Sequence, residues 1–335
     1  MTEQTKLPLL ESIKSSLLPN VFGSLDENIK KIEKAFNVKI VNRDGGIQIL
    51  GENASKASDV MKKLVAIAEK GVEITEQNVT YLIGSHEDEG FSEVEKINDD
   101  TICLAINGRP IRPKTLGQKK YIDQIRKNTV VFGIGPAGTG KTFLAMAMAI
   151  TAFKNNEVGR IILTRPAIEA GENLGFLPGD LQQKVDPYLR PLYDALHEIM
   201  GSETFLRNME RGLIEVAPLA YMRGRTLDNS FIVLDEAQNT TPEQMKMFLT
   251  RMGYGSKVVI TGDITQIDLP AGKKSGLNDA ANLLKDIEDI GITRLTDKDV
   301  VRHPLVQKIV VAYEKRRATE EHRKARIVRH KHGKY

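Results

Sequence analysis

Eight consecutive residues, 135–142, have the types and the spacing of a loop that binds phosphate. They read GPAGTGKT, and they connect an apolar run to a longer apolar stretch that is typical of a buried helix. Glycines let backbone N–H groups point into such a loop, and the start of the following helix adds partial positive charge. The lysine of this pattern can contact the β and γ phosphates of a nucleotide, and the hydroxyl after it can bind Mg²⁺. The residues expected to bind nucleotide here are Gly135, Pro136, Ala137, Gly138, Thr139, Gly140, Lys141 and Thr142.

An acidic pair follows a second apolar run farther along the chain. The run FIVL is followed by Asp235 and Glu236, and a strand with this ending delivers its acids to the edge of a sheet. Beside a phosphate loop, Asp235 is expected to hold Mg²⁺, and Glu236 to act as general base on the attacking water. The Glu next to the Asp favours hydrolysis over phosphoryl transfer to a small molecule. The alternative is a strand that ends in a helix cap, because TTPEQ follows.

Two glutamines are candidates for contacts with the nucleotide. Gln266 follows an expected strand within TGDITQ, just after Asp263, where its amide can contact the γ-phosphate or the attacking water. An ordinary turn with an Asp cap is the alternative. Gln118 precedes the phosphate-loop strand, and an amide that both donates and accepts hydrogen bonds can recognise the edge of adenine. A Gln on the surface of a helix would look the same in the sequence.

Several arginines are candidates for stabilising the charge of a transferring phosphoryl group. Arg302 precedes the expected C-terminal helix in DVVRHP and is our catalytic candidate. Arg165 leaves an expected strand, where it can bind nucleic-acid phosphate, reach a neighbouring subunit's nucleotide or form a structural salt bridge. Arg223 and Arg225 form a basic pair upstream of the acidic strand. Any of the four fits the role of an arginine finger on sequence grounds.

A parallel sheet is needed to bring these residues together. From residue 129 onward, short apolar runs alternate with helical patterns, which is typical of such a sheet. Most runs lack alternation of polar and apolar residues, as expected for strands covered on both faces. We therefore predict an α/β fold, a RecA-like P-loop NTPase sheet with helices on both faces. The expected strands are 130–134, 160–165, 213–216, 231–235, 257–261 and 292–295.

A smaller α+β module is expected to precede this sheet. A helix from Ser24, a hairpin about Asp44-Gly45-Gly46 and a helix over 54–70 give the order helix, strand, strand, helix. A polar, acidic linker follows, and then a second hairpin that turns at Asn107-Gly108. The predicted domains are a module over 1–95, a linker and hairpin over 96–115, a P-loop core over 116–312 and a basic tail over 313–335.

Composition limits the kind of protein this is. The one cysteine, Cys103, excludes an internal disulfide and favours a reducing compartment. No apolar run approaches the roughly 20 residues that a membrane helix needs, and no signal peptide is recognisable, so we expect a cytoplasmic protein without a membrane partner. The net charge of +4 is uneven, because residues 313–335 hold nine Lys/Arg against three Glu. Such tails are common in nucleic-acid binders, and a solvated helix end is the alternative.

The motifs together resemble those of a known family. GQKKY, GPAGTGKT, LDEAQN and GDITQ are similar to the core of superfamily 1 helicases. With KTLGQKKY, TRPAIEAGENLGFLPGD, RGRTL and VVRHPLV added, the chain resembles the PhoH family of bacterial P-loop ATPases over about residues 110–320. The resemblance implies ATP binding and hydrolysis, association with RNA, ring-like homo-oligomers, and a small zinc endoribonuclease of rRNA maturation as partner. The N-terminal module resembles a KH-like RNA-binding fold, although residues 24–70 contain no GxxG clamp.

These observations predict an oligomeric ATPase that uses ATP and Mg²⁺, associates with single-stranded RNA, and acts in RNA processing or ribonucleoprotein remodelling. Lys141, Glu236, Gln266 and Arg302 are its expected catalytic residues. Only 69 residues follow Gln266, too few for a second motor domain, so a neighbouring subunit in a ring is expected to bring an arginine finger. The alternative is an ATP-dependent regulatory switch that acts through a protein partner, an endoribonuclease, without remodelling RNA directly. A small-molecule kinase fits the phosphate loop but not Glu236 or GDITQ.

Overall fold

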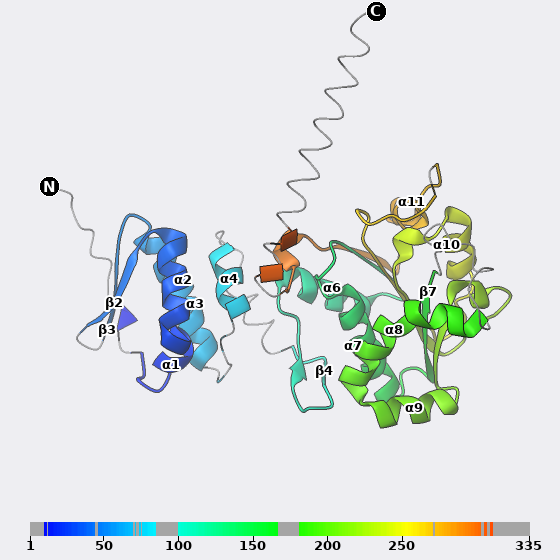
Figure 1. The fold of residues 1–335 in the computed structure, drawn as a ribbon, viewed down its shortest axis with the longest axis horizontal. Helices are drawn as coiled ribbons and strands as arrows, with labels where there is room; N and C mark the ends of the chain where they lie inside the picture. The colour runs from blue at the N-terminus through cyan, green and yellow to red at the C-terminus, as the bar shows by residue number, and fades with distance from the viewer. Residues whose placement is uncertain are drawn as a thin grey trace, which may run out of the picture.

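The computed structural model shows a small N-terminal module and a larger core that contains the main sheet (Figure 1). The described residues are 10–84 except 12, 44–45, 70, 72–73 and 75, then 100–166, 181–270, 272–302, 305–306 and 309–310. Most of the acidic linker, the centre of the first hairpin turn and the basic tail over 313–335 therefore lie outside the described residues. No helix in the described part of the chain is long and apolar enough to cross a membrane.

The N-terminal module is an α+β unit, as the sequence predicts. Its described strands form an antiparallel sheet in the order β1-β3-β2, in which β2 and β3 are the expected hairpin. Ile32, Phe36, Val60 and Leu64 are buried together beside this sheet, because residues spaced three and four apart share one face of a helix. The elements are β1 (Leu10–Glu11), α1 (Leu18–Phe22), α2 (Glu27–Phe36), β2 (Lys39–Arg43), β3 (Gly46–Leu50), α3 (Ala54–Glu69) and α4 (Glu76–Gly84).

The first predicted helix begins later than the sequence pattern indicates. Ser24–Asp26 forms a short 3₁₀ turn in which Leu25 and Asp26 have φ angles of 51° and 62°. This left-handed backbone interrupts the helical hydrogen bonds, so α2 starts at Glu27 and no side chain caps it. The expected start at Ser24 is therefore wrong by three residues.

The second predicted hairpin is confirmed. β4 (Cys103–Leu104) pairs antiparallel with β5 (Pro110–Ile111), and the turn between them contains Gly108 at a φ of 78°. A residue with a side chain rarely adopts this angle, which is why Asn-Gly is common in such turns. Cys103 is partly buried against the apolar core, as a small packing residue would be.

Parallel strands form the predicted sheet of the core. Their order is β11-β6-β10-β9-β7-β8, and each neighbouring pair runs parallel. The strands are β6 (Val130–Ile134), β7 (Arg160–Arg165), β8 (Ile214–Pro218), β9 (Ser230–Leu234), β10 (Lys257–Gly262) and β11 (Ile290–Arg294). All six expected strands are present, with ends shifted by at most two residues.

Helices cover both faces of this sheet, so the predicted P-loop NTPase type of α/β fold is confirmed. Successive side chains of a strand point to opposite faces; accordingly, Val131 packs in one apolar cluster, whereas Val130 and Phe132 pack in the other. On the Val131 face lie α6 (Leu116–Lys127), α7 (Lys141–Lys154), α8 (Leu181–Met200) and α9 (Ser202–Glu210). On the opposite face lie α10 (Pro242–Leu249) and α11 (Gly276–Leu283). Further 3₁₀ turns are Leu219–Met222, Ala237–Asn239 and Asp297–Asp299.

Candidate functional site

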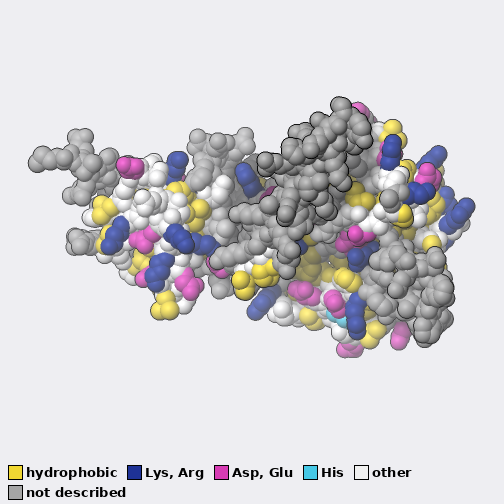
Figure 2. All heavy atoms as spheres, turned by 45° about the horizontal axis from the view of Figure 1, so that its top comes forward, with side chains coloured by type: hydrophobic (Ala, Val, Ile, Leu, Met, Phe, Trp, Pro, Cys, Tyr) yellow, Lys and Arg dark blue, Asp and Glu magenta, His cyan; other side chains and the backbone are white. Residues whose placement is uncertain are grey.

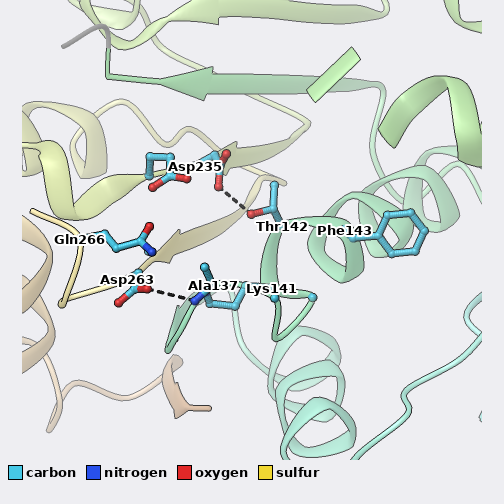
Figure 3. Close-up of a pocket in the computed structure, with 11 residues that line it drawn as sticks. Ala137, Lys141, Thr142, Phe143, Asp235, Asp263 and Gln266 are labelled. Carbon is cyan, nitrogen blue, oxygen red and sulfur yellow. Dashed lines mark hydrogen bonds between the residues drawn. The ribbon is translucent and has the colours of Figure 1, made fainter. Parts of the chain in front are cut away.

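The loop at 135–140 connects β6 to α7. Gly138 and Gly140 have φ angles of 87° and 76°, which residues with a side chain rarely adopt, so these two turns of the loop depend on glycine. The loop is also fastened to the end of β10, because the Ala137 N–H donates to Asp263 Oδ2 at 3.0 Å (Figure 3). The backbone of the predicted phosphate cradle is thus held by a neighbouring strand end.

Lys141 begins α7, and its amine lies inside the loop. Nζ donates to the carbonyl oxygens of Gly135 at 2.6 Å and Pro136 at 2.8 Å, and the residue is 8% exposed. Burial lowers the pKa of this amine, and the nearby carboxylate of Asp263 opposes that shift. A buried ammonium is costly unless it is paired, so the position is suited to contact with phosphate oxygens.

Thr142 and Asp235 meet although they are far apart in the sequence. The Thr142 hydroxyl donates to Asp235 Oδ1 at 2.6 Å, and the Thr261 hydroxyl donates to the same oxygen at 2.9 Å. Asp235 directly follows β9, which lies beside β10, so two strand ends and the first turn of α7 place oxygen atoms at one point. Hydroxyl and carboxylate oxygens are the ligands that Mg²⁺ prefers, so the residues present fit that cation.

One cavity, at the carboxyl edge of the sheet, gathers most of the predicted site residues. Its volume is about 250 Å³. Figure 3 shows residues from the ends of β9 and β10 facing the phosphate loop and the start of α7. The side chains with predicted or potential chemistry that line it are Lys141, Thr142, Asp235, Glu236, Asp263 and Gln266.

Glu236 has an unusual backbone and an engaged carboxylate. Its φ of 52° lies in the left-handed region, which is uncommon for a residue with a side chain. Oε1 lies 3.4 Å from Arg165 Nη2, and Oε2 accepts a hydrogen bond from Gln238 Nε2. Gln238 also donates to the Gln266 carbonyl at 3.1 Å and accepts from the Asp263 N–H at 3.0 Å. Gln238, which is buried, therefore links Glu236, the expected base, to the segment that carries Gln266.

Gln118 lies on α6 beside the phosphate loop but does not line the cavity. Its Nε2 donates to the Thr139 carbonyl at 3.1 Å, and its Oε1 accepts from the Lys114 N–H at 2.6 Å. Both ends of the amide are thus bonded to the protein backbone, and the residue is buried. The structure assigns Gln118 a contact with the loop, and adenine recognition stays a prediction.

Arg302 lies against the phosphate loop of its own chain, outside the residues that line the cavity. A Cβ built on Gly138 would come within 2.1 Å of Arg302 Nε, and the Val301 N–H donates to the Gly138 carbonyl at 2.9 Å. Two residues before Val301, Asp299 accepts a buried hydrogen bond of 2.6 Å from the hydroxyl of Thr115, the cap of α6. The end of the core that carries Arg302 is therefore tied both to the loop and to the start of α6.

The other arginine candidates differ in their surroundings. Arg225 binds Glu215 through two guanidinium nitrogens at 2.6 and 2.7 Å, and these hydrogen bonds raise the pKa of Arg225. Arg223 is exposed to solvent. Arg165 alone of these three contacts a residue of the cavity, the predicted base Glu236.

Thr261, Gln238 and the Thr115–Asp299 pair were not singled out from the sequence. Thr261 lies in TGDITQ and Gln238 lies in LDEAQN, the same motifs that contain expected site residues. Their position in these motifs is the sequence signal from which they could have been predicted. The Thr115–Asp299 bond joins residues 184 positions apart, and local sequence carries no sign of it.

A parallel sheet with a glycine-rich loop before a helix, and with acids at the end of a strand nearby, defines this chain as a P-loop NTPase-like protein. Residues 110–314 match the family described as PhoH-like protein, and the chain belongs to that family. A PhoH-like protein of Bacillus subtilis (strain 168) is 53% identical over 298 residues, which are 88% of this chain and 93% of that protein. One from Mycobacterium tuberculosis (strain ATCC 25618 / H37Rv) is 55% identical over 303 residues, 89% and 85% respectively.

Among solved structures, the Sulfolobus solfataricus SWI2/SNF2 ATPase core in complex with dsDNA is similar over 54% of this chain and 42% of its own. The TM-score is 0.32 and the identity 15%, too low to bear on function. The family assignment rests on the sequence matches, which confirm the resemblance expected from the motifs.

Proposed function

We propose that the protein binds ATP with Mg²⁺ and hydrolyses the nucleotide. The observation that carries this proposal is the single cavity in which Lys141, Thr142, Asp235, Glu236 and Gln266 come together from three stretches of the chain. They supply a cation for phosphate, oxygen ligands for a metal, a carboxylate to accept a proton and an amide to position water. These are the groups that hydrolysis of a nucleoside triphosphate requires.

Each group has a distinct part in the reaction. Lys141 neutralises the β and γ phosphates, and the N–H groups of the loop bind them without reorganisation. Thr142 and Asp235 would hold Mg²⁺, which supplies positive charge to the phosphate oxygens when bound. Glu236 accepts a proton from the attacking water, whose oxygen bonds to the γ-phosphorus as the bond to the leaving ADP oxygen breaks.

Gln266 and Arg302 complete the proposed machinery. The amide of Gln266 faces the cavity and orients the attacking water or detects the γ-phosphate. Arg302 rests on Gly138 of the phosphate loop, where its guanidinium can offset charge that develops on the transferring group. This placement favours a role for Arg302 at the nucleotide site of its own chain, in addition to any arginine finger from a neighbouring subunit.

We also propose that the protein acts on RNA or ribonucleoprotein as a ring-shaped oligomer. The family resemblance supports this, and so does the basic composition of residues 313–335, because Lys and Arg neutralise RNA phosphates. On the face drawn in Figure 2, the described Lys/Arg and Asp/Glu side chains are interspersed.

The test is ATP hydrolysis by the full-length protein with and without a single-stranded oligo-uridine, at low and at high salt. We expect phosphate release without any acceptor, stimulation by RNA, and weaker stimulation at high salt or after truncation before residue 315. A rate of ATP hydrolysis that does not change when RNA is added would refute the coupling to RNA. It would favour the alternative, a regulatory switch that acts through an endoribonuclease. If phosphate were released from ATP only when a phosphoryl acceptor is added, the proposed ATP hydrolysis would be refuted. A monomeric mass in light scattering would refute the proposed ring.

A further inference from the structure

Glu236, the proposed general base, is held from two sides. Its Oε1 faces Arg165 Nη2 at 3.4 Å, and its Oε2 accepts from Gln238 Nε2. An attacking water must hydrogen bond to this carboxylate before its proton can be transferred. The water therefore competes with Arg165 and Gln238 for the orientation of Glu236.

Gln238 is the partner that stays in place. It is 1% exposed, and its amide also donates to the Gln266 carbonyl and accepts from the Asp263 N–H. Moving this side chain would leave its own buried amide and the buried Asp263 N–H without partners, which is costly. Gln238 thus holds one oxygen of Glu236 in place.

Arg165 is the more exposed of these two partners of Glu236. It is the last residue of β7, and the side chains of Arg165 and Glu236 are 22% and 32% exposed. Both side chains keep partial contact with water, and their contact of 3.4 Å is longer than the about 2.7–2.9 Å of a strong charged hydrogen bond. A guanidinium binds phosphate through two parallel hydrogen bonds, so a phosphate group can compete with Glu236 for Arg165.

Resting on the RNA-coupled hydrolysis proposed above, we propose that Arg165 restrains Glu236 until a phosphate of single-stranded RNA binds Arg165 and frees the base. Arg165 does not line the nucleotide cavity, so the competing phosphate comes from outside it. β7 lies directly beside β9, the strand that delivers Glu236, so RNA at the end of β7 is one strand away from the base. Arg165 is a positioning residue, because it acts through Glu236 and touches no reacting atom.

The experiment compares Arg165→Gln with Arg294→Gln in the full-length protein. Arg294 is a matched control, since it is an exposed arginine at the carboxyl end of β11 in the same sheet. We expect Arg165→Gln to raise kcat without RNA several-fold, toward the RNA-stimulated rate of the parent, with unchanged KM for ATP and unchanged ADP affinity. Added oligo-uridine should then stimulate it little, whereas Arg294→Gln should behave as the parent does.

Two results would overturn the proposal. An unchanged or lower kcat without RNA in Arg165→Gln, with ADP affinity retained, would mean that Arg165 supports the reaction rather than restraining it. If kcat of Arg165→Gln without RNA were raised but RNA still stimulated the variant as strongly as the parent, the idea that an RNA phosphate releases Glu236 from Arg165 would be overturned.

The failure of the proposed function is distinguishable from these results. If the parent protein itself is not stimulated by RNA, the coupling to RNA fails and release by RNA fails with it. The kcat of Arg165→Gln without RNA still tests whether Arg165 restrains Glu236. Should that variant not fold, Arg165→Met decides in its place: it keeps most of the side chain's length and removes the charge that pairs with Glu236, so a raised kcat supports the restraint and an unchanged or lower one overturns it.

Discussion

Replacing Lys141 by Met should weaken nucleotide binding and leave the fold intact. Met keeps most of the length of the buried side chain and removes the ammonium that donates to Gly135 and Pro136. Two effects on stability oppose each other. Burial disfavours the charged amine, as its lowered pKa indicates, whereas the carbonyls lose a donor. The Pro136 carbonyl keeps the Thr139 hydroxyl at 2.8 Å, so the main loss is at Gly135.

The expected magnitudes follow from this balance. One unpaired carbonyl costs about 1–3 kcal/mol, and relief of the buried charge offsets much of it, so the unfolding free energy should change by less than about 1 kcal/mol. Nucleotide binding has no such compensation. A hydrogen bond to a charged group contributes about 1.5–3 kcal/mol, which corresponds to a roughly 10- to 150-fold loss of ATP affinity.

Three measurements check the prediction: calorimetric titration with ADP and Mg²⁺, phosphate release from ATP, and urea unfolding followed by circular dichroism. Lys154→Met is the matched control, because Lys154 is exposed at the other end of α7 and should leave all three unchanged. Parental affinity for ADP in Lys141→Met would refute the phosphate contact. A loss of several kcal/mol in stability would show instead that the amine mainly holds the loop together.

The same geometry predicts four further results. Glu236→Gln should keep ATP binding and lose phosphate release; lost binding in calorimetry would make Glu236 a structural or metal-binding group. Thr142→Ala should raise the Mg²⁺ concentration needed for hydrolysis by about tenfold or more, because an oxygen ligand is lost; an unchanged Mg²⁺ titration would contradict that role. Asp299→Asn should lower the unfolding free energy in urea by about 1–3 kcal/mol, because an amide nitrogen replaces one of the two oxygens that accept from Thr115 and Thr296 and leaves one donor unpaired, whereas Asp297→Asn on the exposed side of the same turn should change it by less than about 0.5 kcal/mol. Tyr121→Phe should be neutral or stabilising in the same assay, because the buried hydroxyl has no hydrogen-bond partner among the described residues; a loss above about 1 kcal/mol would show that it has one.

The sheet could be predicted from the sequence because its signals are local. Strands covered on both faces appear as apolar runs, and glycines at fixed spacing mark the loop before α7. The start of α2 could not, because Leu25 adopts a left-handed backbone that its residue type does not suggest. The acids after β9 were placed correctly at a strand end, since one run of four apolar residues carries them there.

The partners of the site residues could not be predicted, because they depend on strand order. Arg165 reaches Glu236 since β7 lies beside β9 in the sheet, although β8 comes between them in the chain. Thr261 reaches Asp235 for the same kind of reason, across β10 and β9. Gln118 was expected to recognise a base, and its sequence gives no sign that backbone groups of the loop occupy its amide.

The hydrogen bond between Thr115 and Asp299 joins the start of α6 to the segment that follows β11. Thr115 caps α6, and Asp299 stands two residues before Val301, whose N–H donates to the Gly138 carbonyl. The start of α6 and the segment that follows β11 are therefore joined to each other and to the phosphate loop. Loss of the Thr115–Asp299 bond is therefore expected to loosen the phosphate loop and the start of α6 together.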